Sequence, residues 1–319
     1  DQELDIYNLF TQISLSPKTS IQAEFRQNDR ETGDLPLRFD PDLIYENLRQ
    51  EEQTNSVRLG FHHAFTPNSD IIVSSTYVDS NDEASFEDPD FSYDLEEKGD
   101  GFMNELQHLF RYEQFSIISG AGHLDSEYED TERITFLSVP TTTVTDFDNR
   151  HTNFYIYSQS AFPESVTWTV GGSADFFEGL IVERDQWNPK FGLTWDILPN
   201  TTFRAAIFRT LKRTLTTNQT IEPTQVAGFN QLFDDPPGAD VWRYGAALDQ
   251  KFSHTLYGGV EFSRRELEVP FLFTDVSDNI TGVDEGDWEE HLGRTYLFWT
   301  PHPWLAASIE FLYERLERS

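Results

Sequence analysis

Residues 190–197 read KFGLTWDI, and this stretch decides the fold because large apolar side chains alternate along it with small or polar ones. The odd positions carry Phe, Leu, Trp and Ile, and the even positions carry Lys, Gly, Thr and Asp. Successive side chains of an extended strand point to opposite faces, so one face of this segment is apolar and the other is polar. The stretch therefore predicts a β-strand with an apolar environment on one side and water on the other.

The same alternation recurs on either side of short turns along the whole chain, for example in residues 21–26, 56–65 and 242–249. Proline, asparagine, serine or threonine occupies most of these turns, and each favours a turn conformation. Seven turns can be marked in this way, at Pro17, Pro67, Glu113, Pro163, Pro199, Ser253 and Pro301. Their spacing of 36 to 54 residues leaves room for two long strands rather than the four short strands of a propeller blade. The sequence thus predicts about fourteen strands, paired through short turns.

Longer polar and acidic stretches separate the strand pairs at the opposite rim. They cover residues 30–53, 79–100, 125–150, 176–187, 211–240 and 267–287. Short turns on one rim and long loops on the other are typical of outer-membrane barrels, whose long loops face the outside. We therefore predict one all-β domain over residues 1–319, an antiparallel up-and-down transmembrane β-barrel in the outer membrane of a Gram-negative cell. Its short turns would be periplasmic and its acidic loops extracellular, and outer-membrane lipid and lipopolysaccharide would surround it.

Composition excludes several other classes of protein. The net charge of -33, from 23 Lys and Arg against 56 Asp and Glu, argues against a nucleic-acid partner, because phosphate binding needs clustered cations. No stretch approaches the roughly 20 apolar residues of a membrane-spanning helix, whereas a barrel strand needs only about 9 to 11. Cysteine is absent, which leaves no disulfide framework and no thiolate chemistry. We expect no cofactor.

The direction of the outermost strands predicts that the barrel is partial. The first strand, at residues 5–15, runs towards a short turn, and the last, at residues 305–314, leaves one. Both ends of the chain would then lie on the extracellular side. Because an unpaired strand edge must be covered, closing the barrel would require at least one further strand at each end.

Two neighbouring segments resemble a known family. Residues 188–195 (NPKFGLTW), the turn at residues 198–201 and residues 202–209 (TFRAAIFR) are similar to the barrel of TonB-dependent receptors, in which an N-P-K-x-G-L strand, a short turn and an L-R-A-A strand recur. The resemblance implies a barrel of 22 strands around an N-terminal plug that imports a scarce ligand with energy from TonB. Neither a plug nor a TonB box precedes residue 5, so the TonB contact would depend on a missing plug.

Three alternatives stay open at this point. Outer-membrane barrels linked to tetratricopeptide repeats, which export polysaccharide, share the strand pattern. A soluble acidic β-rich binding protein would also alternate in this way. An enzyme is disfavoured because no Gly-x-Ser-x-Gly motif occurs and no nucleophile and base can be paired from spacing.

Few residues suggest a binding site. The densest group of cations in this acidic chain could attract an anionic ligand, although salt bridges to acidic neighbours are the simpler interpretation. This group consists of Arg204, Arg209, Lys212 and Arg213. Among the acidic loops, Asp79, Asp82 and Glu83 are the best candidates for a divalent cation, but they lack the spacing of a calcium loop, so no metal site is predicted.

Overall fold

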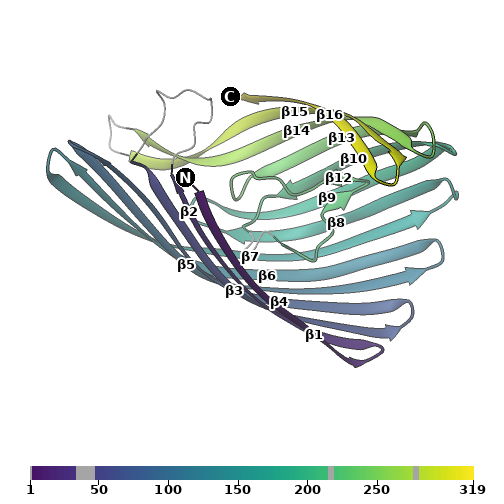
Figure 1. Cartoon of the computed structure of the whole chain (residues 1–319), viewed down its shortest axis with the longest axis horizontal. Helices are drawn as coiled ribbons and strands as arrows, with labels where there is room; N and C mark the ends of the chain where they lie inside the picture. The colour runs from purple at the N-terminus through teal and green to yellow at the C-terminus, as the bar shows by residue number, and fades with distance from the viewer. Residues whose placement is uncertain (1, 34–46, 215–218, 276–279) are drawn as a thin grey trace.

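A single antiparallel sheet of fourteen strands makes up almost the whole molecule (Figure 1). The computed structural model describes residues 2–33, 47–214, 219–275 and 280–319. The sheet follows the order of the chain: β1 (Gln2–Ser16), β2 (Thr19–Gly33), β3 (Arg49–Thr66), β4 (Ser69–Asp88), β5 (Phe91–Tyr112), β6 (Phe115–Phe136), β7 (Val139–Ala161), β8 (Val166–Glu178), β9 (Glu183–Leu198), β10 (Thr201–Leu211), β13 (Asp240–Lys251), β14 (Leu256–Asp275), β15 (Ile280–His302) and β16 (Leu305–Arg318). The predicted all-β, up-and-down architecture of about fourteen strands is confirmed.

The turns that correspond to the seven predicted from the sequence all lie at one rim of the sheet, at the right of Figure 1, which we call the short-turn rim. Six of the seven predicted turns connect strands at the positions expected from the sequence. The seventh is displaced slightly, because β15 continues to His302 and an irregularity in the pairing falls between Trp299 and His302. Strands β1 and β16 form the two edges of the curved sheet. No helix of the described residues is long and apolar enough to cross a membrane.

The strands extend further from the short turns than the sequence pattern suggests. Residues 79–100 and 125–150, predicted as loops, instead continue the strands as two long hairpins. Each hairpin closes with a two-residue turn, at residues 89–90 and 137–138. Cross-strand ring contacts support the extension, such as the stacking of Tyr128 on Phe147 with ring centroids 5.0 Å apart. These segments carry charge on both faces, so the alternation that identified the lower strands is absent even though the backbone pairing continues.

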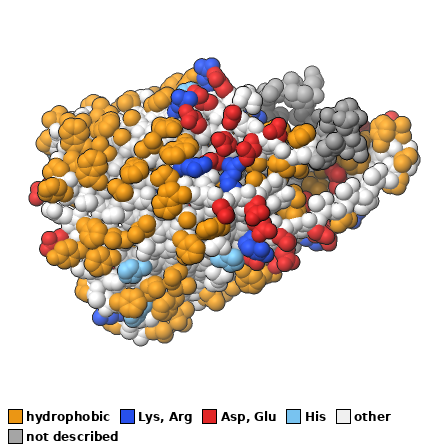
Figure 2. Space-filling model, turned by 180° about the vertical axis from the view of Figure 1, so that it is seen from behind, with side chains coloured by type: hydrophobic (Ala, Val, Ile, Leu, Met, Phe, Trp, Pro, Cys, Tyr) orange, Lys and Arg blue, Asp and Glu red, His pale blue; other side chains and the backbone are white. Residues whose placement is uncertain are grey.

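The two faces of the sheet have opposite character, as the alternation predicts. On β9, Lys190 is 2% exposed whereas its neighbour Phe191 is 50% exposed. Figure 2 shows the outer face from behind, with hydrophobic side chains gathered over the half nearest the short turns and charged side chains beyond them. A monomer in water rarely exposes so large an apolar area, whereas a strand facing lipid does so over its membrane-spanning part.

Candidate functional site

Part of the connection between β10 and β13 lies against the inner face of the sheet, as Figure 1 shows. We call residues 219–239 the inner segment. It contains a small hairpin of β11 (Gln225–Val226) and β12 (Phe229–Asn230), whose turn residues Ala227 and Gly228 both have positive φ. Such a two-residue turn matches the twist of a hairpin, and glycine adopts its conformation without strain.

Two apolar side chains attach the hairpin to the wall of the sheet. Val226 and Phe229 are both 0% exposed and belong to a buried cluster with Tyr155, Tyr157 and Phe208. Burying large apolar side chains contributes roughly 1.5 to 3 kcal/mol each. The hairpin is therefore a packed element of the structure.

Glu222 is the main polar anchor of the inner segment. Its carboxylate accepts hydrogen bonds from Asn153 Nδ2 and from the Tyr157 hydroxyl, both at 2.8 Å, and pairs with Arg213 at 2.9 Å. Glu105 of β5 accepts a hydrogen bond from the backbone N–H of Ile221 at 3.1 Å. A buried charge is tolerated only when it is paired and hydrogen-bonded, and Glu222 meets this condition. Glu105 is held by hydrogen bonds from Thr220 and from the backbone of Ile221.

Three arginines from neighbouring strands face the hairpin from the wall. Arg204 of β10 donates to Asp249 at 2.6 Å. Arg243 of β13 donates to Ser263 Oγ at 2.9 Å. Arg265 of β14 pairs with Glu290 at 2.5 Å and with Asp235 of the inner segment. The inner wall therefore presents a row of cations, which we call the arginine row.

A second buried network stabilises the wall beside the arginine row. Asp175 of β8 accepts hydrogen bonds from Ser173 and Asn188 at 2.6 Å, and its other oxygen lies 3.0 Å from His151. All these side chains are buried. A satisfied network of this kind fixes side-chain positions, so it positions β8 and β9 under the inner segment.

The structure separates the four predicted cations. Arg204 and Arg213 lie on the inner side, whereas Arg209 has the parity of the outer face, where it pairs with Asp240. The Nζ atom of Lys212 donates to the backbone carbonyl of Phe233 at 2.5 Å. All four cations therefore have protein partners, and their role in ligand binding stays a prediction.

The candidate metal ligands lie on β4 rather than in a loop. Asp82 and Asp79 are three residues apart, so they face opposite sides of the sheet, and the described residues contain no group of three or more metal-ligating side chains that could hold an ion. Asp82 belongs instead to a cross-strand row with Glu97 and Asp130. Burial raises the pKa of Glu97, and the carboxylates of Asp130 and Asp82 add to this effect.

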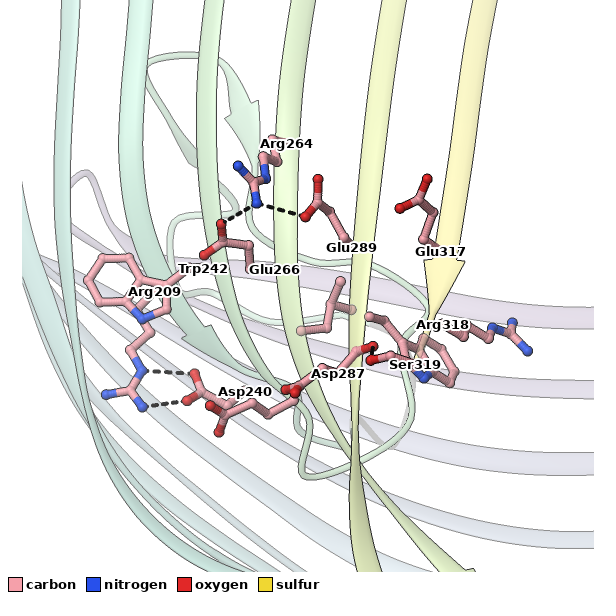
Figure 3. A pocket seen from close by; sticks show the side chains of 13 residues that line it. Arg209, Asp240, Trp242, Arg264, Glu266, Asp287, Glu289, Glu317, Arg318 and Ser319 are labelled. Carbon is pink, nitrogen blue, oxygen red and sulfur yellow. Dashed lines mark hydrogen bonds and ion pairs between the residues drawn. The ribbon is translucent and has the colours of Figure 1, made fainter.

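A further charged area lies on the outer face of β13, β14 and β15, away from the short turns. Figure 3 shows the Arg264 guanidinium between Glu266 and Glu289, at 2.9 and 2.7 Å. These groups line a cavity of about 540 Å³ together with Trp242 and Arg318. This area is the charged surface that borders the apolar outer face.

The inner segment was not identified from the sequence. Two features of the sequence could have indicated it. One is the apolar pair Val226 and Phe229 within a polar connection, and the other is the presence of Gly192 and Gly245 at inward-facing positions of the strands. Alternation alone could not show that these positions meet.

Comparison with known proteins gives a consistent result. A family described as "TonB dependent receptor-like, beta-barrel" matches residues 7–296. The ferric preacinetobactin receptor BauA from Acinetobacter baumannii is similar in structure, with a TM-score of 0.71 and 11% identity over 98% of this chain and 54% of that one. The ferric yersiniabactin uptake receptor FyuA from Yersinia pestis has a TM-score of 0.74 and 8% identity over 100% of this chain and 52% of that one.

The ferripyoverdine receptor of Pseudomonas aeruginosa has a TM-score of 0.70 and 13% identity, over 99% of this chain and 50% of that one. The chain thus spans about half the length of the solved structures it matches. At these identities the likeness concerns the fold alone. No curated protein sequence matches the chain.

Proposed function

The chain belongs to the TonB-dependent receptor β-barrel family, and we propose that it forms part of the wall of an outer-membrane receptor that imports a scarce ligand with energy from TonB. One observation carries the proposal: a single sheet combines an apolar outer face with an inner face of buried charged groups. Lipid on one side and an aqueous, ligand-accessible lumen on the other would account for both faces. Family membership favours this function over polysaccharide export and over a soluble binding protein.

The surroundings of the sheet follow from the same arrangement. The apolar half of the outer face would contact the lipid chains, with the short turns on the periplasmic side. The charged area around Arg264 would then lie at the level of the lipopolysaccharide headgroups. Its mixture of guanidinium and carboxylate groups suits a surface of phosphates and divalent cations.

The ligand class to test first is an anionic metal chelate. The named relatives are receptors or uptake proteins for ferric complexes, and the inner wall here carries the arginine row. Of the four cations considered from the sequence, Arg204 and Arg213 are the ones proposed to steer such a ligand, because they lie on the inner side. Arg209 is excluded from this role by its outer parity.

Uptake by intact cells tests the function directly. A deletion strain, the same strain carrying the gene, and a strain that also lacks TonB would be supplied with a panel of iron-55 chelates. The proposal expects at least one chelate to accumulate about tenfold more in cells with the gene, and only when TonB is present. Accumulation that is unchanged without TonB, or equal in all strains for every chelate, contradicts it.

A further inference from the structure

We propose that the hairpin of the inner segment, together with Phe233 and Asp235, is a built-in occupant of a binding site on the arginine row, and that an anionic ligand with a planar aromatic group displaces it. This inference deepens the proposed import function and rests on it for the direction in which the ligand moves. The contacts between the hairpin and the wall define the site and its chemistry.

Aromatic rings of the inner segment stack on the arginine row. Phe229 lies 5.3 Å from the Arg204 guanidinium carbon and 5.6 Å from that of Arg243, measured from the ring centroid. Phe233 lies 4.8 Å from Arg243 and 3.8 Å from Arg265. Cations attract the faces of aromatic rings, and guanidinium groups also stack on them. The wall therefore recognises planar rings.

Acceptor groups of the same segment satisfy the donors of the wall. Arg243 Nη1 donates to the carbonyl of Asn230 at 2.7 Å, and Arg204 Nη1 donates to that of Ala227 at 3.3 Å. The carboxylate of Asp235 pairs with Arg265. Carboxylates of the wall, Asp249, Glu261 and Glu290, already pair with these arginines. To the arginine row the segment adds two carbonyl acceptors and the Asp235 carboxylate, so a ligand that replaces it must offer comparable acceptors and at least one anionic group.

The occupant leaves some donors of the site unused. Among the described residues, the buried Nε atoms of Arg243 and Arg265 have no hydrogen-bond partner. An unsatisfied buried donor is unfavourable, and a ligand with more acceptors than the hairpin could satisfy it. The hairpin therefore fits the site without using all of its donors.

Two glycines of the wall form the seat of the hairpin. A Cβ atom at Gly192 would lie 2.9 Å from the side chains of both Ala227 and Val226, and one at Gly245 would lie 2.5 Å from the ring of Phe229. Any larger residue at either position would prevent this close approach. These two glycines therefore accommodate the hairpin closely. Removing the hairpin from this seat would leave the three arginines of the arginine row in place.

The hairpin could separate from the wall without breaking the hydrogen bonds between strands of the main sheet. β11 and β12 form a separate two-stranded sheet, so the hairpin adds no strand to the wall. At its base, the backbone of Lys212 bonds to Gly238 and Ala239, both at 2.8 Å. A segment can open locally without unfolding the rest of a structure, and opening here would expose Val226 and Phe229 and break the ion pair of Asp235. A ligand that binds only the open form would compete with the hairpin, and its apparent affinity would fall with the open fraction.

The test removes the occupant and measures binding to the purified intact protein in detergent, without TonB. Gly245→Leu fills the seat of Phe229 and leaves all three arginines in place. The matched control is Gly60→Leu, on the inner face of β3, where a Cβ would meet only the Gln22 side chain beside a cavity of about 500 Å³. The probes are benzene-1,3,5-tricarboxylate and, as its non-aromatic counterpart, propane-1,2,3-tricarboxylate, measured by titration calorimetry.

The proposal expects Gly245→Leu to bind the aromatic probe at least tenfold more tightly than the unaltered protein, and Gly60→Leu to bind it as the unaltered protein does. Adding Arg243→Gln should remove this gain, and the aliphatic probe should bind at least threefold more weakly. Phe229→Ala, which removes the occupant ring without filling the seat, should reproduce the gain if Gly245→Leu does not fold.

Equal affinity of the Gly245→Leu, Gly60→Leu and unaltered proteins, or binding that survives Arg243→Gln, overturns the proposal. Equal affinity for the two probes overturns its aromatic part. Because no step of this assay requires TonB or transport, a failure here differs from a failure of uptake in cells.

Discussion

A charged residue on the outer face should destabilise the protein in proportion to its depth in the membrane, and β9 allows this to be calculated. Leu193 is five residues from Leu198, where β9 ends at the short-turn rim. At about 3.3 Å per residue and a tilt of about 40°, it lies about 13 Å above that rim, near the middle of an apolar band about 25 Å tall. Trp187, eleven residues from the same end, lies about 28 Å above the rim and outside the band.

Leu193→Arg should therefore lower the free energy of unfolding by about 2 to 4 kcal/mol relative to Leu193→Ala. Trp187→Arg should lower it by only about 0 to 1 kcal/mol relative to Trp187→Ala. Comparing arginine with alanine at each site removes the effect of losing the original side chain. Urea unfolding in lipid vesicles, followed by tryptophan fluorescence, measures both differences. Equal differences at the two sites, or no cost at Leu193, would refute the assignment of this face to lipid.

Three further predictions concern charged groups. Glu222→Ala leaves Arg213 buried without its carboxylate and should destabilise the docked inner segment by about 3 to 5 kcal/mol, seen as faster hydrogen exchange at residues 225–230 but not in the wall strands. Because the folded-state pKa of Glu97 is raised above its ordinary 4.5, the folded protein binds a proton at this carboxylate more strongly than the unfolded chain does. The free energy of unfolding should therefore rise as pH falls through the raised pKa towards 4.5. Glu97→Gln should reduce that rise, measured by urea titration at each pH. Arg264→Gln should change unfolding stability by less than about 1 kcal/mol, since its ion pairs are partly exposed, but should reduce the lipopolysaccharide that copurifies with the protein; unchanged copurification argues against headgroup contact.

The lower halves of the strands could be predicted because two rules act together there. An apolar outer face and a polar inner face produce a period of two, as in residues 190–197, and short turns limit where each strand can reverse. Residues 79–100, further from the short-turn rim, carry charged side chains on both faces, so they lose the alternation and their charges suggest a loop. The backbone pairing that continues through them leaves no periodic signal in the sequence.

The site was predictable only in part. Arg204 and Arg209 are five positions apart on one strand, so their side chains must point to opposite faces of the sheet. Their closeness in the sequence nevertheless suggests a single cluster of cations. The contact between Phe229 and Gly245, by contrast, depends on a connection folding back across the sheet. No local propensity encodes that approach, because it requires the curvature of strands that are distant in sequence.

The accessibility of spin labels along β9 would show whether its outer face contacts lipid, since the absence of cysteine allows one label to be placed at a time. Labels would be attached through single cysteines at each position from 187 to 195 in the protein reconstituted in lipid bilayers. If this sheet is a membrane wall, the odd positions from 189 to 195 collide mainly with oxygen dissolved in lipid and the even positions do not, with a period of two, whereas position 187 lies above the apolar band. Collision with a water-soluble nickel complex at Phe191 and Leu193, or accessibility without alternation, would contradict the claim that this sheet is a membrane wall.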